Sequence, residues 1–593
     1  MRLDADRSRT RLGSSVDREV STNQPPLTAL SSIGDTHAPS PSSRPRNRLQ
    51  ALIVFVGGVV LMHSIYAGDG GWWKHVSGVP GNDSFYHIKM ASLMPQVGLL
   101  REFPWLKFCY FTDQGQAFIS HHYGFHALLV PFVKLSRWLT GDELPGGRWA
   151  ICTFFGLMLV LLDRLLVIAR TPWRWLWLPL FVLLPFQFFT RHAFVRAITP
   201  SLVLMLLILL LMFRRRYVWT AFAVALYVHL YMGGVIFGPL IVGLYVVAML
   251  IAPPKDGRNP WRLAVWAVAG WTIGIATHPY RDGMWEFLRM QVFGTGLSPD
   301  IQVGKEWKPY NDLWWFAQMT GVTLGVWAAA VFARLRLGKP ANAEELALVL
   351  MNFAFLVLTL KSRRFIEYWP MFCLLSAAYL AAPVIGNITE SLQRRAKART
   401  HDRLVKLAPI GVVGLAAMVV AISPVWQEIR RTSQCDYDLS AIRAAMDFLQ
   451  EQSQPGEVVF TDDWDIFPVY FYYNSHNHYV VGLDPKFTHA RRPDLWERYV
   501  KITRGQTPSD VQVETRDAQG RPLIEKLHVS LADIRDHFGA DYVVTDRDHR
   551  PLAEKLAAAK DFAELIYPST SYAKSRDAAY LVFRIHGERP AQP

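Results

Sequence analysis

The chain has 593 residues, of which 51% are hydrophobic, 13% aromatic and only 19% charged. Soluble domains carry about 25% charged residues, and the hydrophobic residues here gather in blocks of about 17–22, the length that spans a bilayer. This excludes an ordinary soluble enzyme and predicts a polytopic membrane protein. The formal net charge is +14, but most Arg and Lys residues lie at the ends of apolar runs. That placement follows the positive-inside rule, so nucleic acid is not an expected partner.

The N-terminal segment, residues 1–48, is rich in Ser, Pro, Thr and Arg and predicts a disordered cytoplasmic tail. After it, apolar runs predict about eleven transmembrane helices. The runs are 49–67, 148–168, 173–190, 198–213, 217–232, 235–252, 261–278, 313–334, 344–361, 364–385 and 405–424. A shorter run, 123–136, contains polar residues and predicts an interfacial helix on the outer face. We expect its neighbours His121 and His122, and its own His126, near Asp83.

Basic segments between the runs predict the topology. The segments expected in the cytoplasm are 214–216, 334–339 and 394–406. Counting spans from them places the loops 68–147 and 279–312 outside, together with everything after about residue 425. The predicted domains are therefore the tail, a transmembrane domain at 49–424 and an extracytoplasmic domain at 425–593.

The last part of the chain is polar and mixes helical and strand-like patterns. Helical patterns occur at 440–452 and 552–559. Strand-like patterns occur at 457–461, 542–545 and 579–585, and the aromatic runs 470–474 and 479–485 also favour strands. The sequence therefore predicts a soluble α/β domain attached to the last span.

Two acidic residues stand out in the predicted outer loops. Asp83 follows the first span at the start of a helical stretch, and Glu306 is a lone acid in an aromatic and basic setting. Such carboxylates suit a divalent cation or a general base. The simpler interpretations are that Asp83 only caps a helix and that Glu306 only faces water.

Two pairs of arginines break the positive-inside pattern. Arg191 and Arg196 lie in a short outer loop, and Arg363 and Arg364 lie between two apolar runs. Arginine makes bidentate contacts with phosphate, so these residues are candidates for binding a lipid-linked phosphate. Snorkelling to the membrane surface is the alternative.

The order of these features resembles that of the GT-C glycosyltransferases, most of all the catalytic subunit of oligosaccharyltransferases, over roughly residues 49–485. The segment 82–87, Asn-Asp-Ser-Phe-Tyr-His, resembles the first-loop motif of that family. The resemblance implies that Asp83 binds a metal or activates the acceptor. The segment 301–310 resembles the motif in the long outer loop of that family. The resemblance implies that Glu306 has the role of the glutamate in that motif. Arg363 or Arg364 would hold the lipid pyrophosphate.

The resemblance is incomplete at two places. The family has an acidic pair in the short loop that here contains Arg191 and His192 and no acid. His192 could complete a Mg²⁺ or Mn²⁺ site with Asp83 and Glu306. In the C-terminal acceptor motif, only Trp464 and Asp465 of five residues remain. They are candidates for acceptor binding, but recognition of an Asn-X-Ser/Thr sequon is not implied.

The sequence thus predicts a multi-pass glycosyltransferase of the inner membrane. It would move a sugar or oligosaccharide from a polyprenyl phosphate or pyrophosphate to a protein, lipid or glycan acceptor on the outer face. We expect the carboxyl groups of Asp83 and Glu306 in one cavity, less than about 15 Å apart, with Arg363 or Arg364 at its rim. Two alternatives stay open: a monosaccharide transferase that uses a polyprenyl monophosphate, and a transport or envelope protein without chemistry.

Overall fold

The computed structural model describes most of the chain. The described residues are 43–67, 78–109, 118–297, 304–395, 424–516 and 521–587. The chain forms two compact units, Met1–Gln50 and Ala51–Pro593, and the site lies in the second unit. The predicted tail up to residue 42 and the predicted span 405–424, except its last residue, lie outside the described residues.

Among the described residues, six helices are long and apolar enough to cross a membrane. They are α1 (Ser43–Ala67), α4 (Leu144–Ile168), α9 (Gly234–Ile251), α12 (Leu313–Leu335), α13 (Ala343–Lys361) and α14 (Trp369–Arg395). A seventh span arises if the bent pair α6 (Phe186–Ala193) and α7 (Ile198–Phe213) counts as one. The chain is therefore a multi-pass membrane protein, while the predicted number of about eleven spans is not confirmed.

Several spans begin at the residue that the sequence pattern favours. Asp312 accepts hydrogen bonds from the first backbone N–H groups of α12, and Asn342 forms a capping box with Glu345 at the start of α13. Asn259 caps α10 (Pro260–Ala276) in the same way, while α8 (Tyr217–Leu230) has no such cap. Asn and Asp satisfy the exposed N–H groups of a helix start, which explains the agreement with the predicted boundaries.

One predicted run, 173–190, is not a continuous helix. It divides into α5 (Arg174–Phe181) and α6, which begins directly after Pro185. Proline lacks a backbone N–H and clashes with the preceding turn, so it separates the two helices. The chain then bends by 110° between α6 and α7. The bend therefore places residues 194–197 at the start of α7 rather than within a continuous helix.

Three helices outside the six spans line the same end of the molecule. They are α2 (Asn82–Val97), α3 (Tyr123–Thr140) and α11 (Arg281–Arg289), which continues into a π-helical turn at Met290–Leu297. Helix α3 covers the predicted interfacial run and packs between α2 and α4. Its depth in a membrane stays a prediction.

The C-terminal part contains a five-stranded mixed sheet in the order β2-β1-β5-β7-β6. Its strands are β1 (Val458–Thr461), β2 (His478–Tyr479), β5 (Tyr542–Asp546), β6 (Ala563–Tyr567) and β7 (Tyr580–Ile585). Strands β1, β2 and β5 run parallel, whereas β7 is antiparallel to both β5 and β6. Strands β1, β5 and β7 lie at the three segments with the clearest predicted strand patterns.

Helices and a separate hairpin complete the C-terminal part. The helices are α16 (Pro424–Thr432), α17 (Leu439–Gln452), α18 (Phe467–Tyr473), α19 (Pro485–His489), α20 (Pro493–Thr503), α21 (Asp533–Asp536), α22 (Arg550–Ala558) and α23 (Tyr572–Ser575). The hairpin pairs β3 (Ser509–Arg516) with β4 (Pro522–Val529). The strand predicted at 470–474 is wrong, because these residues form the end of α18. Pro468 favours the first turn of a helix, and the aromatic side chains pack against α2.

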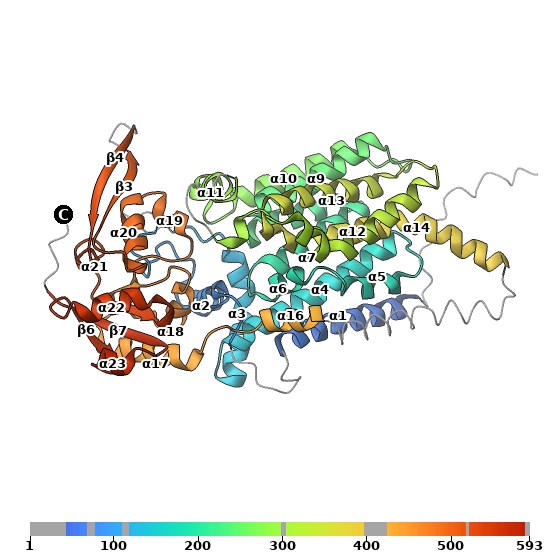
Figure 1. The fold of residues 1–593 in the computed structure, drawn as a ribbon. Coiled ribbons are helices and arrows are strands. Elements are labelled where there is room, and N and C mark those ends of the chain that lie inside the picture. The colour runs from blue at the N-terminus through green and yellow to red at the C-terminus, as the bar shows by residue number, and fades with distance from the viewer. Residues whose placement is uncertain are drawn as a thin grey trace, which may run out of the picture. The chain divides into compact units, whose positions relative to one another are not determined.

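The strand-bearing part adjoins one end of the helices through α2 and the segment after it (Figure 1). The backbone of residues 105–108 runs along β2, with Tyr479 N–H donating to Trp105 O at 2.8 Å and Lys107 N–H donating to Tyr479 O at 2.9 Å. The rings of Phe85 and Tyr472 meet edge to face at 5.7 Å. These contacts hold the C-terminal part over the ends of the spans, where the predicted site residues lie.

Candidate active site

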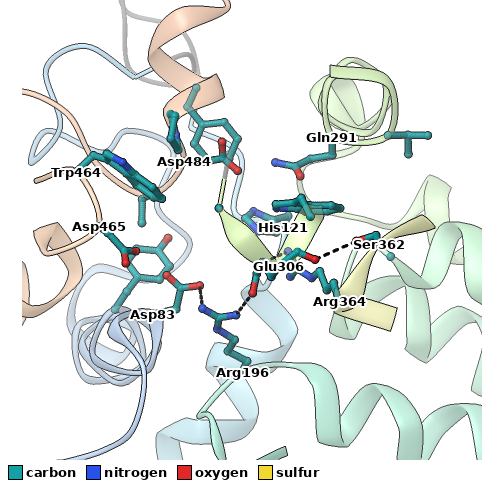
Figure 2. A pocket seen from close by; sticks show the side chains of 18 of the residues that line it. Asp83, His121, Arg196, Gln291, Glu306, Ser362, Arg364, Trp464, Asp465 and Asp484 are labelled. Atoms are coloured by element: carbon teal, nitrogen blue, oxygen red, sulfur yellow. Dashed lines mark hydrogen bonds and ion pairs between the residues drawn. The ribbon is translucent and has the colours of Figure 1, made fainter. Parts of the chain in front are cut away.

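A cavity of about 1790 Å³ opens where the spans meet the C-terminal part. Six of the nine predicted site residues line it, and they come from five separate segments of the chain. These six are Asp83, Arg196, Glu306, Arg364, Trp464 and Asp465. Figure 2 shows them facing one space, with Asp83 and Trp464 on one wall and Arg364 on the other. Arg191, His192 and Arg363 do not line the cavity.

Asp83 lies in the first turn of α2, where a negative charge is favourable to the helix dipole. It is not the helix cap, because Gly81 holds that position with a positive φ of 73° and no side-chain hydrogen bond. The Asp83 carboxylate instead contacts Arg196, with Oδ2 2.8 Å from Nη2. Asp83 thus has a partner that a simple capping residue would not need.

Arg196 lies in the bend between α6 and α7 and bridges two acids. Its Nη1 is 3.3 Å from Glu306 Oε2, while Nη2 holds Asp83 (Figure 2). The backbone there is fixed by a hydrogen bond from Val195 N–H to Ser84 Oγ at 2.9 Å, and the ring of Phe194 lies 5.1 Å below the guanidinium. Asp83 and Glu306 therefore share one cavity, well inside the limit of about 15 Å.

Glu306 lies in the 3₁₀ turn Lys305–Trp307 and does not face bulk water. Its carboxylate contacts Arg191 and Arg196 through Oε2, and Arg364 through Oε1 at 3.1 Å. Burial raises the pKa of a carboxyl group, but the guanidinium groups outweigh it and hold the pKa of Glu306 well below its usual range. The sequence pattern that suggested a solvated acid missed these three partners, which are 58, 110 and 115 residues away along the chain.

The two arginines predicted to bind the pyrophosphate separate in the structure. Both belong to the 3₁₀ turn Arg363–Glu367 between α13 and α14. Arg364 lies over the ring of Trp307 at 4.7 Å and lines the cavity. Arg363 donates from Nε to Pro309 O at 3.1 Å and lies over the Tyr310 ring, outside the cavity lining. Of the two, only Arg364 is placed to meet a ligand in the cavity.

Arg191 and His192 lie outside the cavity lining but contact residues that belong to it. Arg191 pairs with Glu306 and, through Nη2 at 3.1 Å, with the buried Glu367. His192 is buried, with Nδ1 2.9 Å from Thr199 Oγ1 and Nε2 2.9 Å from the backbone oxygen of Glu367. Both ring nitrogens of His192 therefore have partners within the protein.

Trp464 and Asp465 follow β1 and are tied to the start of α2. Asn82 donates from Nδ2 to the backbone oxygen of Asp465 at 2.7 Å and accepts from the Tyr437 hydroxyl at 2.7 Å. This link places Asp465 beside Asp83. Desolvation by the cavity walls, together with the negative charges of Asp83 and Asp463, raises the pKa of Asp465 to about 7.

Known structures share this architecture, although no protein-family model and no curated protein sequence matches the chain. The apo oligosaccharyltransferase of Archaeoglobus fulgidus superposes with a TM-score of 0.57 at 12% identity, over 87% of this chain and 73% of that one. The same enzyme tethered to an acceptor peptide containing the NVT sequon gives 0.52 at 13% identity, over 88% and 73%. ArnT from Cupriavidus metallidurans in the apo state gives 0.53 at 12%, over 90% and 98%.

The chain has the GT-C glycosyltransferase fold. The resemblance noted in the sequence is thus confirmed, and at such low identity the similarity concerns the fold alone. This fold brings residues from distant loops together beneath the C-terminal part.

The predicted metal ligands do not fit a divalent cation in this GT-C cavity. Asp83 and Glu306 are bridged by a guanidinium, and His192 has both ring nitrogens engaged elsewhere. Across the described ranges, one other group of three side chains could hold a metal ion, namely Asp462, Asp546 and His549. It lies at the carboxyl ends of β1 and β5, and Asp462 and His549 also line the cavity.

Several residues of the cavity were missed or undervalued in the sequence. Glu367 pairs with Arg191, and its signal was an acid three residues after two arginines, between two apolar stretches. Burial raises the pKa of Asp484 to about 6, and nothing in its local sequence suggested this. Beside the predicted histidines His121 and His122, His87 also lines the cavity, and its Nδ1 is 2.8 Å from Nε2 of His126.

Proposed function

We propose that this protein is a membrane glycosyltransferase that transfers a sugar or oligosaccharide from a polyprenyl phosphate or pyrophosphate to an acceptor. The observation that carries the proposal is the meeting of an acid, two arginines and an apolar surface in one cavity. Asp83 lies on one wall, and Arg196 and Arg364 lie nearer the spans (Figure 2). Departure of a phosphate needs positive charge near the leaving oxygen, and acceptor activation needs an acid on the opposite side.

An apolar strip leads from Arg364 toward the spans and suits the hydrocarbon chain of such a donor. The cavity lining continues over α9 and α13, where large apolar side chains are exposed. They include Ile236, Phe353 and Val357, which are 41%, 48% and 64% exposed. Contiguous exposed apolar surface next to cationic side chains fits an amphiphile with an anionic head.

The roles follow from the walls on which the residues lie. Arg364, with Arg196, would stabilise negative charge on the departing phosphate, and Arg191 would hold Glu306 in place from behind. Asp83 would orient or deprotonate the nucleophile of the acceptor. Trp464 and Asp465 would bind the acceptor beside Asp83, since Asn82 ties their loop to the start of α2. Positioning and electrostatic stabilisation could supply most of the rate, with no covalent intermediate.

The proposal places the reaction on the outer face of the inner membrane, with residues 425–593 extracytoplasmic. The basic segments between the spans support this orientation through the positive-inside rule. The acceptor would be a protein, a lipid or a glycan. The likeness to an oligosaccharyltransferase determined with an acceptor peptide makes a protein acceptor the first to test.

The test is a profile of glycans and polyprenyl-linked intermediates in a deletion strain. We expect one polyprenyl-linked species to accumulate and one glycoconjugate to disappear. Complementation with the wild-type gene should reverse both changes, whereas Asp83→Asn should not, at an equal level of protein. Asp282→Asn makes the same change at a side chain that is 91% exposed on α11 and should complement fully. Full complementation by Asp83→Asn would reject the catalytic role of this residue.

A further inference from the structure

The charges around Glu306 balance without any metal ion. Three carboxylates, those of Asp83, Glu306 and Glu367, interlock with three guanidinium groups, those of Arg191, Arg196 and Arg364. Mg²⁺ and Mn²⁺ are held by oxygen ligands that carry net negative charge. A cluster whose formal charges cancel offers no such excess, and a cation entering it would meet three positive groups.

Arg196 occupies the position between the two acids that a bridging cation would take. One terminal nitrogen contacts Asp83 at 2.8 Å and the other contacts Glu306 at 3.3 Å (Figure 2). The side chain of Arg196 is only 14% exposed. It is fixed by the ring of Phe194 below it and by the hydrogen bond from Val195 N–H to Ser84. The guanidinium is therefore built into the site rather than resting on its surface.

The remaining ligands for a metal are too few. Glu306 has both oxygens engaged by arginines, and His192 has both ring nitrogens engaged by Thr199 and Glu367. With Arg196 on Oδ2, Asp83 offers a single carboxylate oxygen that lies beside a guanidinium group. Mg²⁺ is commonly held by one or two whole carboxylates together with substrate phosphates, and the bridge leaves no carboxylate of this cluster whole.

We propose that the guanidinium of Arg196 replaces a divalent cation in this cavity. It holds Asp83 and Glu306 at a fixed spacing, neutralises their mutual repulsion and presents positive charge to a donor phosphate. The site then binds an anionic head group without a metal ion. The inference rests on the proposed function only for the identity of that anion, since the bridge itself is a property of the apo protein.

The inference predicts that removing the guanidinium creates a metal site, because both carboxylate oxygens of Asp83 become accessible and the cluster keeps one uncompensated negative charge. The probe is Mn²⁺, titrated into full-length purified protein that has been stripped with EDTA, with binding followed by electron paramagnetic resonance and by the melting temperature. We expect the wild-type protein and Asp83→Asn to bind the same amount of Mn²⁺. Arg196→Ala should bind one additional ion per chain and melt at a higher temperature when Mn²⁺ is present. The double variant Asp83→Asn/Arg196→Ala should lose that ion.

Two controls keep the result specific. Arg196→Lys retains a positive charge and should not gain the additional ion. Any Mn²⁺ held by Asp462, Asp546 and His549 is common to all variants, so the difference between variants reports only the Arg196 site. If Arg196→Ala does not fold, the comparison of wild type with Asp83→Asn still decides the question.

The inference is overturned if wild-type protein binds one Mn²⁺ ion that Asp83→Asn loses, because a metal would then displace the guanidinium. It is also overturned if folded Arg196→Ala gains no ion. Neither measurement uses a sugar donor. Failure of the proposed glycosyl transfer would appear in the glycan and lipid profile of the deletion strain, so the two proposals can fail separately.

Discussion

At the scale of single residues, the cavity is defined by how Glu306 is neutralised. Its carboxylate contacts three arginines from the segments 191–196 and 363–367. Removing one partner of a buried ion pair is costly, because the remaining charges keep their desolvation penalty without their compensation. Glu306 therefore matters for stability as well as for its proposed position beside the donor.

Glu306→Gln should destabilise the folded protein at neutral pH, by less than the roughly 3–5 kcal/mol of a fully buried ion pair, because the Glu306 side chain is 27% exposed. The pKa of Glu306 lies well below its ordinary value, so its contribution is fully present above about pH 4.3 and is lost as the pH falls through the lower folded-state pKa. The melting temperature of Glu306→Gln should lie below that of wild type by the same amount at pH 8, 7 and 6. This difference in melting temperature should become smaller below about pH 4.3. Glu286→Gln, at an exposed residue of α11, should leave the melting temperature unchanged. An equal melting temperature for Glu306→Gln and wild type at pH 7 would contradict the buried network.

Asp465→Asn should stabilise the protein only slightly in neutral and alkaline solution, because Asp465 is exposed and solvent screens most of its charge. The folded-state pKa of Asp465 is raised to about 7, whereas an unfolded chain ionises its Asp residues at a lower pH. Between these two pKa values the unfolded state is favoured more and more as the pH rises, and above the folded-state pKa the loss of stability is constant. The gain in melting temperature for Asp465→Asn should therefore grow from about pH 4 to pH 7 and then level off. Asp548→Asn, an exposed acid on the same cavity, serves as the control. A gain that is independent of pH would show that charge is not its cause.

At the scale of secondary-structure elements, the site depends on contacts between α2 and the C-terminal part. Asn82, the first residue of α2, accepts a hydrogen bond from the Tyr437 hydroxyl and donates one to the backbone oxygen of Asp465. Ser84, in the same turn, accepts from Val195 in the bend between α6 and α7. One helical turn thus positions both Arg196 and the loop of Trp464 and Asp465.

Asn82→Ala should weaken this arrangement by two hydrogen bonds, each contributing about 0.5–1.5 kcal/mol. We expect a lower melting temperature and a reduced yield of glycoconjugate in complementation. Tyr437→Phe removes one of the two bonds, so its effect on melting should be about half as large. An equal effect of Tyr437→Phe and Asn82→Ala on melting would show that the Asp465 contact contributes nothing.

At the scale of the whole molecule, the proposed function requires the cavity to face the outside. Alkaline phosphatase fused after Pro593 should be active, and a fluorescent protein that folds only in the cytoplasm should be dark at the same position. Fusions after Arg216 should give the opposite result, because the basic segment 214–216 is predicted to be cytoplasmic. Active phosphatase only at Arg216 would invert the topology and remove the proposed site from the outer face.

The sequence predicted several of the spans and three of the seven strands in the described part of the chain, β1, β5 and β7, because these signals are local. Apolar length and the strand patterns before residues 461, 545 and 585 each depend on neighbouring residues only. Local pattern also misled, because the aromatic run at 470–474 has strand propensity but forms α18. Arg196 and Arg364 were recognisable as charges of the costly sign next to apolar runs, and Asp83 and Glu306 as acids in predicted outer loops.

Only the tertiary structure decided how those charges pair. The 110° bend after α6 directs Arg196 between Asp83 and Glu306, and a single 3₁₀ turn separates Arg364, in the cavity, from Arg363, outside it. The partners of Glu306 lie between 58 and 115 residues away along the chain. Ion pairing over such separations leaves no trace in local hydrophobic periodicity, because it depends on where the packed helices end and on which side chains then face each other.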